Sequence, residues 1–219
     1  MNFEKLKTLP IDKIFNGIKL SFENSEELYE SALLLKDHKK YGVAISVLIL
    51  SVEEIIKSTS LFAFLIFDKQ DFMKDLFKSN NLHKERLDLA LIFSENFKLK
   101  DLQKIESINN INFDTTELLE KVKNEKHSFE NWFNKAKTLK NDGLYVDFDN
   151  KFKSPSKFTE KDFNKSFEYS KEIREPLFLL LSILVNIDII EFEEVVNAFK
   201  VIIKGKSDSH LGIEPSTQE

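Results

Sequence analysis

The chain has 219 residues, 42% of them hydrophobic, and a formal net charge of −5 at pH 7. This length and apolar content favour one folded domain with a buried core and exclude disorder throughout. The acidic balance argues against a nucleic-acid coat protein and a polybasic membrane binder. The absence of cysteine excludes disulfides and thiolate metal sites, and the N-terminal MNFEKLKTLP lacks the apolar segment of a signal peptide.

Two apolar stretches raise the question of a membrane helix. Val43–Phe67 carries three ionisable residues at its middle. Leu177–Ile190 is shorter than the roughly 20 residues that span a bilayer. We therefore expect both stretches to be buried core helices, and we expect a cytoplasmic protein that does not contact membranes.

Glycine occurs five times and proline four times, a scarcity that is typical of stacked helices rather than of hairpins. In the N-terminal half we expect a break at Tyr41-Gly42 and helices over Ile11–Leu20, Ser25–Lys39, Val43–Asp68, Asp71–Lys78 and Leu82–Phe97. In the C-terminal half we expect helices over Thr115–Lys140, from Thr159 to about Val185, and over Ile190–Ile203. The pattern predicts one all-α domain over residues 1–203, followed by a flexible tail over residues 204–219.

The C-terminal half also contains the clearest signals for helix boundaries. Thr159 and Asp162 have the spacing of a capping box, which opens a helix. Pro176 should kink or divide that helix, because proline cannot donate a backbone hydrogen bond. Between the helices, Asn141–Phe158 is predicted to be a loop with a short extended piece.

Glu53 and Glu54 lie in the middle of the most apolar expected helix. Glu53 precedes Lys57 by four residues, the favourable order for an exposed ion pair on a solvated stripe. Glu54 has largely apolar neighbours one turn away, so its carboxylate must find partners or remain desolvated at a free-energy cost. Because carboxylates in apolar surroundings recur at functional sites, Glu54 is a candidate site residue.

Two further segments carry candidate residues. His83 and Lys84 occur in the first turn of an expected helix, where the helix dipole disfavours a cation, so capping does not explain them. A lone histidine is nevertheless more often structural or merely exposed. The segment LKNDGLYVDF is most simply a helix that stops at Gly143 and is followed by an ordered loop.

No recognised motif for catalysis or metal binding occurs in the chain. The sequence contains no Glu-x-x-His, HExxH, CxxC, Walker, GxGxxG or GxSxG motif. The four histidines are scattered and lack the spacing of zinc ligands. We therefore expect neither a metal nor a cofactor.

In this order, YGVAISVLILSVEEIIK, LHKERLDLA and LKNDGLYVDFDN resemble the AbiV family of bacterial abortive-infection proteins, a branch of the HEPN superfamily. The resemblance implies an HEPN-like antiparallel helical bundle with additional short helices, which forms a homodimer. It also implies a role in phage defence by arresting growth of the infected cell, with a phage protein as a candidate activator.

Many HEPN proteins are metal-independent ribonucleases in which an arginine precedes a histidine by five to seven residues. Neither Arg86 nor Arg174 has such a histidine, and the nearest equivalent is Lys140 followed by Tyr145. On the ribonuclease hypothesis, the scissile phosphate of an RNA substrate would be held by Lys84, Lys140 and Asn141. His83 would take the proton of the ribose 2′-hydroxyl, and Tyr145 would donate one.

Acidic residues complete this hypothesis. Glu54 and Asp147 would orient the cations. Glu54 and Lys57 would face His83 and the Lys140–Asp147 turn within a buried polar network. Two alternatives stay open: a non-catalytic dimeric module that binds a phage protein and a host factor, and a helical bundle that binds a nucleotide or another small anion.

Overall fold

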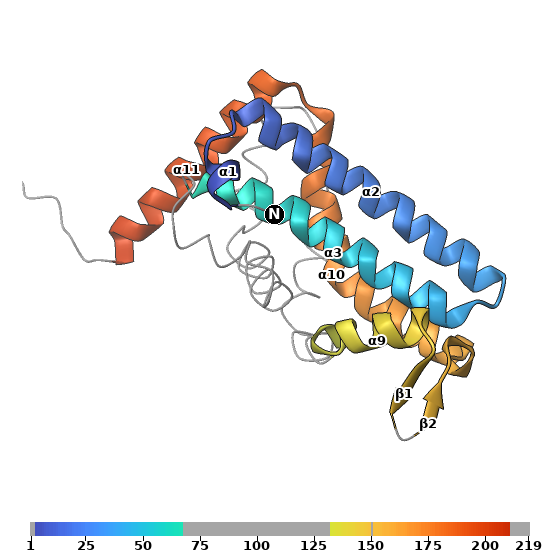
Figure 1. Cartoon of the computed structure of the whole chain (residues 1–219). Helices are drawn as coiled ribbons and strands as arrows, with labels where there is room; N and C mark the ends of the chain where they lie inside the picture. The colour runs from blue at the N-terminus through green and yellow to red at the C-terminus, as the bar shows by residue number, and fades with distance from the viewer. Residues whose placement is uncertain (1–2, 68–131, 150, 211–219) are drawn as a thin grey trace, which may run out of the picture.

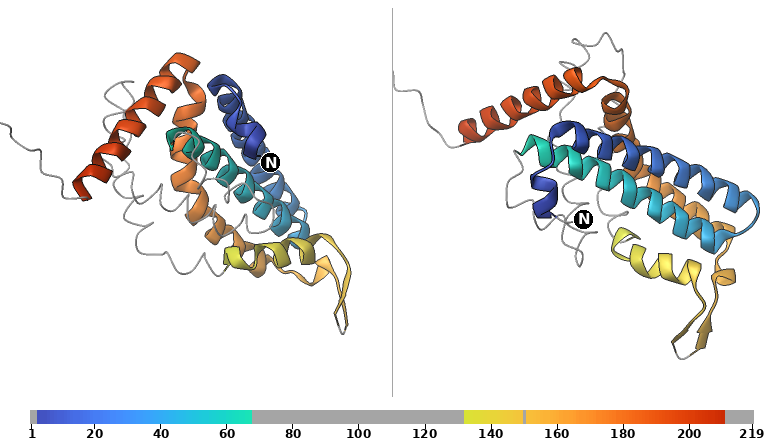
Figure 2. Two further views of the ribbon diagram at one scale, coloured as in Figure 1. Left: turned by 60° about the vertical axis from the view of Figure 1, so that its left-hand side comes forward. Right: turned by 45° about the horizontal axis from the view of Figure 1, so that its top comes forward.

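The computed structural model describes residues 3–67, 132–149 and 151–210. Helices α2, α3 and α10 lie side by side and form the body of an all-α bundle, as expected (Figure 1). Helix α9 and a small β-hairpin lie at one end of this body, and α11 extends from the other (Figure 2). The elements are α1 (Phe3–Lys7), α2 (Ile11–Asp37), α3 (Tyr41–Ile66), α9 (Ala136–Leu144), β1 (Asp147–Asp149), β2 (Lys151–Lys153), η2 (Pro155–Lys157), α10 (Glu160–Asn186) and α11 (Ile189–His210).

Helices α2 and α3 form an antiparallel pair joined by a tight turn. Lys39 adopts a left-handed backbone with φ of 58°, and the Lys40 N–H donates to the Leu35 carbonyl at 2.9 Å, which caps the end of α2. The chain therefore turns before Tyr41-Gly42, and the prediction of a break at that dipeptide is wrong. Gly42 instead lies in the first turn of α3.

Helix α2 is one continuous helix where the sequence pattern predicts two. The second was expected to start at Ser25, but this residue is fully buried inside α2. Its hydroxyl donates to the Ser51 carbonyl of α3 at 3.0 Å. The serine thus joins two helices instead of capping one, which local sequence could not distinguish.

The capping box of Thr159 and Asp162 is confirmed at the start of α10. The Thr159 N–H donates to the Asp162 carboxylate at 2.8 Å, and the Asp162 N–H donates to the Thr159 hydroxyl at 3.4 Å. Pro176 lies inside α10 without dividing it. Leucines beyond it are buried in the core, so packing holds the helix together across the missing hydrogen bond.

Phenylalanines attach α11 to the rest of the bundle. Phe192 stacks on Phe15 of α2 at 4.1 Å between ring centroids, and Phe199 meets Phe62 of α3 edge-on at 5.4 Å. Helix α11 continues to His210, so the backbone of residues 204–210 is helical where a flexible tail is expected. Residues 211–219 lie outside the described ranges, as do the helices expected at 71–78 and 82–97.

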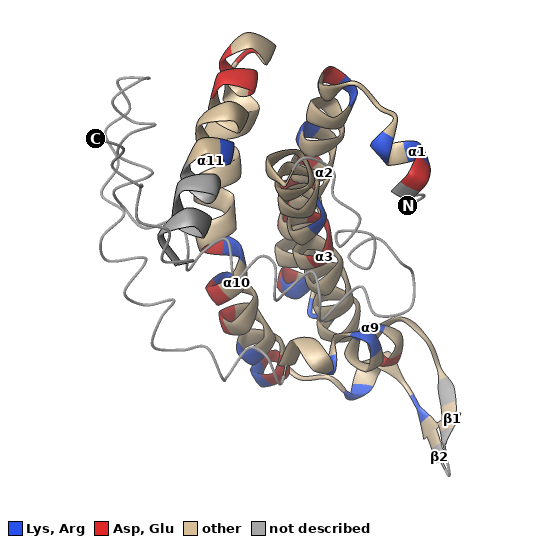
Figure 3. Cartoon of the chain, turned by 90° about the vertical axis from the view of Figure 1, so that its left-hand side faces the viewer, with Lys and Arg blue, Asp and Glu red and all other residues tan. Residues whose placement is uncertain are grey.

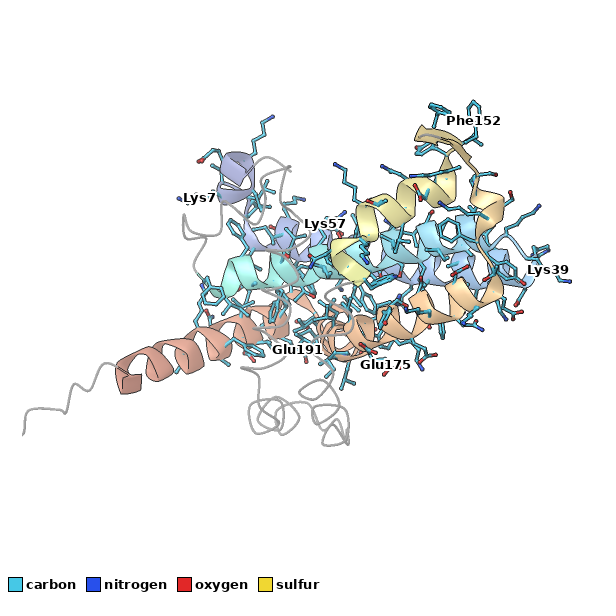
Figure 4. All side chains as sticks on the ribbon, turned by 90° about the horizontal axis from the view of Figure 1, so that it is seen from below. Lys7, Lys39, Lys57, Phe152, Glu175 and Glu191 are labelled. Carbon is cyan, nitrogen blue, oxygen red and sulfur yellow. The ribbon has the colours of Figure 1, made fainter. Side chains whose placement is uncertain are left out.

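The segment expected to be a loop with a short extended piece contains extended backbone, in the form of a small hairpin. Helix α9 continues through Gly143 to Leu144, and β1 and β2 then form an antiparallel pair in which Phe148 lies opposite Phe152. Both phenylalanines are exposed, and Figure 4 shows Phe152 on the hairpin, away from the body of the bundle. Within the described ranges, none of the helices has both the length and the apolarity that crossing a bilayer requires.

Candidate functional site

Helix α9 lies antiparallel to the N-terminal part of α3, and two glycines allow close contact between the backbones. A Cβ atom on Gly143 would lie 2.3 Å from the Gly42 carbonyl oxygen and 2.2 Å from Oγ of Ser46. A Cβ atom on Gly42 would lie 2.5 Å from the Pro155 carbonyl oxygen of η2. Gly143 is therefore required for helix packing, a role that the sequence pattern did not predict, although α9 does end one residue later, at Leu144.

Hydrogen bonds fix the backbone of α9 at this crossing. The Ser46 hydroxyl lies 2.9 Å from the Lys140 carbonyl and 3.1 Å from the Gly42 carbonyl. The Lys157 ammonium of η2 also donates to the Asp142 carboxylate of α9, at 2.6 Å. Neither the Ser46 hydrogen bonds nor the Asp142 ion pair involves the side chain of Lys140, which extends along α3.

The Lys140 ammonium donates to both carboxylate oxygens of Glu53, at 2.7 and 2.8 Å. Each side chain is 19% exposed, so the ion pair is shielded but reaches the surface. The direction in which the Lys140 side chain points follows from helix geometry, because helical side chains tilt toward the N-terminus of their own helix. Since α9 is antiparallel to α3, Lys140 points toward the later turns of α3 and meets Glu53 there.

Glu54, the carboxylate favoured by the sequence pattern, belongs to a different contact. It binds Lys57 one turn further along α3 at 2.5 Å, and both side chains are about a quarter exposed. The prediction that Glu54 orients Lys140 is wrong, as is the predicted pairing of Glu53 with Lys57. Consecutive helical residues point about 100° apart, so only one of the two glutamates can face α9.

The remaining predicted residues are only partly brought together. Asn141 and Tyr145 are exposed at the end of α9, where the Tyr145 N–H donates to the Asn141 carbonyl at 2.9 Å. Asp147 begins β1, in register with Lys153 of β2. His83 and Lys84 lie outside the described residues. The sequence therefore locates one end of α9 correctly, but it does not predict the contact of α9 with Glu53 of α3.

A second polar cluster, centred on Arg174 of α10, was not predicted. This guanidinium is 4% exposed, donates to the Ser51 hydroxyl at 2.6 Å and to the Glu26 carboxylate, and lies 4.0 Å from the ring centre of Tyr29. Burial lowers the pKa of Arg174, and Glu26 opposes that shift. Burial also raises the pKa of the Tyr29 hydroxyl against the attraction of the guanidinium. The cluster joins α2, α3 and α10.

The sequence analysis missed the contact between Glu53 and Lys140 and the cluster around Arg174, and both had a signal in the sequence. Gly42, Ser46 and Glu53 are separated by four and seven residues, so they share one face of a helix. Arginine is rare in this lysine-rich chain, and its planar guanidinium suits a buried, stacked position better than a lysine does. Recognising either signal would have required knowing which helices are neighbours.

The described helices carry charges of both signs. In Figure 3, basic and acidic residues are interspersed along the described helices. Among the residues that the structure describes, no group of three or more histidine, aspartate or glutamate side chains could hold a metal ion. The described site is thus a seam between α3 and α9 that centres on the ion pair of Glu53 and Lys140.

Comparison with known proteins adds one finding at the family level. The family model HEPN_AbiV, described as AbiV, matches residues 13–175, which is more than half of the chain. No curated protein and no solved structure matches the chain. The matched range contains α3, α9 and the contact between Glu53 and Lys140.

Proposed function

We propose that this chain, which belongs to the AbiV family of HEPN proteins, acts in phage defence by arresting the growth of infected cells. The observation that supports this proposal most directly is that the family match contains both helices of the Lys140–Glu53 seam. The AbiV family is one of bacterial abortive-infection proteins, so growth arrest of the infected cell is the phenotype that we expect of this chain.

For the reaction, we propose metal-independent cleavage of RNA. The ribose 2′-oxygen attacks the adjacent phosphorus, its proton passes to a base, and the bond to the 5′-oxygen breaks as that oxygen takes up a proton. The products are a 2′,3′-cyclic phosphate and a 5′-hydroxyl. Lys140 and Asn141 would hold the phosphate, with Tyr145 as proton donor and His83 as base. The support for these roles is that Asn141 and Tyr145 are exposed near Lys140 at the C-terminal end of α9.

The test is incubation of the purified protein with total RNA and EDTA, with and without extract of infected cells. We expect cleavage that resists EDTA and leaves 2′,3′-cyclic phosphate ends. Lys140→Ala should abolish both cleavage and growth arrest, whereas Lys137→Ala, at an exposed lysine of the same helix, should retain both. Loss of Lys140 also leaves Glu53 without this partner, so we expect a stability decrease of about 1–2 kcal/mol.

A non-catalytic interaction module is the second candidate function. The observation that favours it is the β-hairpin segment, in which Tyr145, Val146, Phe148 and Phe152 are all more than 60% exposed. Aromatic residues of this kind often anchor protein interfaces. Growth arrest with intact RNA in a Lys140→Ala, His83→Ala double variant would favour this module over the nuclease.

A further inference from the structure

We propose that the ion pair between Glu53 and Lys140 is an autoinhibitory contact that keeps phosphate groups away from Lys140 until the pair opens. The inference concerns the regulation of the site described above. Where it identifies the bound anion as RNA, it rests on the proposed function. The pair itself is an observed contact whose effect on anion binding can be measured separately.

The geometry of the pair leaves Lys140 poorly available to an anion. Both carboxylate oxygens of Glu53 lie within 2.8 Å of the ammonium, so two of its three N–H groups are engaged. A phosphate that approached the remaining N–H would also approach the carboxylate. By Coulomb's law, a negative charge this close to the ammonium cancels most of its attraction for the phosphate.

Two neighbouring lysines, Lys57 and Lys157, do not replace Lys140 in this state. Lys57 is bound to Glu54 at 2.5 Å, and Lys157 is bound to Asp142 at 2.6 Å. The three lysines are thus each matched by a carboxylate. Pairing of these three lysines reduces the capacity of the site to concentrate RNA, which suits a toxin that must stay inactive before infection.

The contact can open without moving α9. The backbone of α9 is held by the Ser46 hydroxyl on the Lys140 carbonyl, by the packing of Gly143 against Gly42, and by the Asp142 ion pair. Rotation of the Lys140 side chain about its own bonds is therefore sufficient to release the ammonium. This makes the pair a local contact with two states, in which a competing anion or partner can take the place of Glu53.

Glu54 provides a matched control for Glu53. It is the next residue of α3, carries the same charge, has similar exposure and also binds a lysine. Its partner Lys57 is on the same helix, so Glu54→Gln removes one negative charge without releasing Lys140. A general effect of net charge should appear in both variants, whereas release of Lys140 should appear only in Glu53→Gln.

The first experiment measures anion binding by the full-length chain with two probes. These are inorganic pyrophosphate and a short RNA with 2′-O-methyl groups, which cannot be cleaved through its 2′-oxygen. We expect Glu53→Gln to bind both probes about tenfold more tightly than wild type. We expect Glu54→Gln to stay within about twofold of wild type. Adding Lys140→Ala to Glu53→Gln should remove the gain.

Equal binding by wild type, Glu53→Gln and Glu54→Gln would overturn the inference, as would a gain that survives removal of Lys140. Should Glu53→Gln fail to fold, Glu53→Asp retains the charge but shortens the side chain, and a smaller gain in binding is expected. Unchanged binding in that folded variant would also overturn the inference.

The second experiment separates this inference from the nuclease proposal. We expect Glu53→Gln to cleave total RNA without extract of infected cells, while wild type requires the extract. If no variant cleaves RNA but Glu53→Gln still gains pyrophosphate affinity through Lys140, the nuclease proposal fails and the autoinhibitory contact stands. If wild type cleaves RNA and Glu53→Gln loses both cleavage and binding, Glu53 positions Lys140 for the reaction, and the autoinhibitory contact is refuted.

Discussion

Gly143 of α9 lies so close to the backbone of Gly42 of α3 that it has no room for a side chain. A Cβ atom on Gly143 would lie 2.3 Å from the Gly42 carbonyl oxygen, well inside van der Waals contact. The obstructing atom belongs to the backbone, so it cannot rotate away. The place of α9, and with it the place of Lys140, depends on this contact.

Gly143→Ala should therefore lower the free energy of unfolding by about 1–3 kcal/mol, because α9 must move away from α3 to accept the methyl group. Gly17→Ala is the control, since its Cβ would meet only Cδ1 of Leu61 at 3.5 Å. There the better helix propensity of alanine should raise stability by about 0.5–1 kcal/mol. Urea denaturation of both variants checks the prediction, which equal effects at the two glycines would contradict.

Arg174→Met should destabilise the fold strongly, because it leaves the Glu26 carboxylate and the Ser51 hydroxyl without their buried partner. We expect a loss of about 2–4 kcal/mol, below the value for a fully buried pair because Glu26 is one-third exposed. The same urea series checks it. Lys171→Ala, which removes an exposed pair on the same helix, should cost less than about 0.5 kcal/mol.

A double variant tests the cause of that loss. Adding Glu26→Gln to Arg174→Met removes the unpaired carboxylate, so part of the lost stability should return. If the double variant is less stable than Arg174→Met, the loss instead reflects packing of the guanidinium on Tyr29.

Thr159→Ala should remove the capping box and lower stability by about 1 kcal/mol near neutral pH. Hydrogen bonds from the Thr159 side chain and backbone lower the pKa of Asp162 in the folded state. A carboxyl group with a lowered folded-state pKa stabilises the fold above its unfolded pKa, and this contribution disappears as the pH falls through the folded value. Thermal unfolding at several pH values should show the difference between wild type and Thr159→Ala shrinking as the solution becomes acidic.

We also expect the protein to be a homodimer in solution, which light scattering at micromolar concentration can measure. The exposed phenylalanines of the hairpin are the natural residues to test. Phe148→Ser with Phe152→Ser should shift the population toward monomer while changing the unfolding free energy by less than about 0.5 kcal/mol. A wild-type monomer would contradict the dimer, and an unaffected dimer would show that the hairpin is not its interface.

Local signals in the sequence determined the helical class and several boundaries. The scarcity of glycine and proline predicts a helical bundle, and Thr159 with Asp162 marks the start of α10, because capping depends only on residues within one turn. The resemblance of three segments also identifies the family that the comparison supports. These features require no knowledge of which helices are neighbours.

Only the tertiary structure decided which residues meet. Ser25 could cap a helix or join two, and contact with α3 selects the second role. Gly143 lies one residue before the end of α9, as the sequence indicates, but its close packing on α3 appears only in the tertiary structure. The choice of Glu53 over Glu54 as the partner of Lys140 depends on how α3 is rotated against α9. That rotation follows from packing Gly42 and Ser46 against Gly143, an interaction between segments about 100 residues apart in the sequence, so a local pattern cannot encode it.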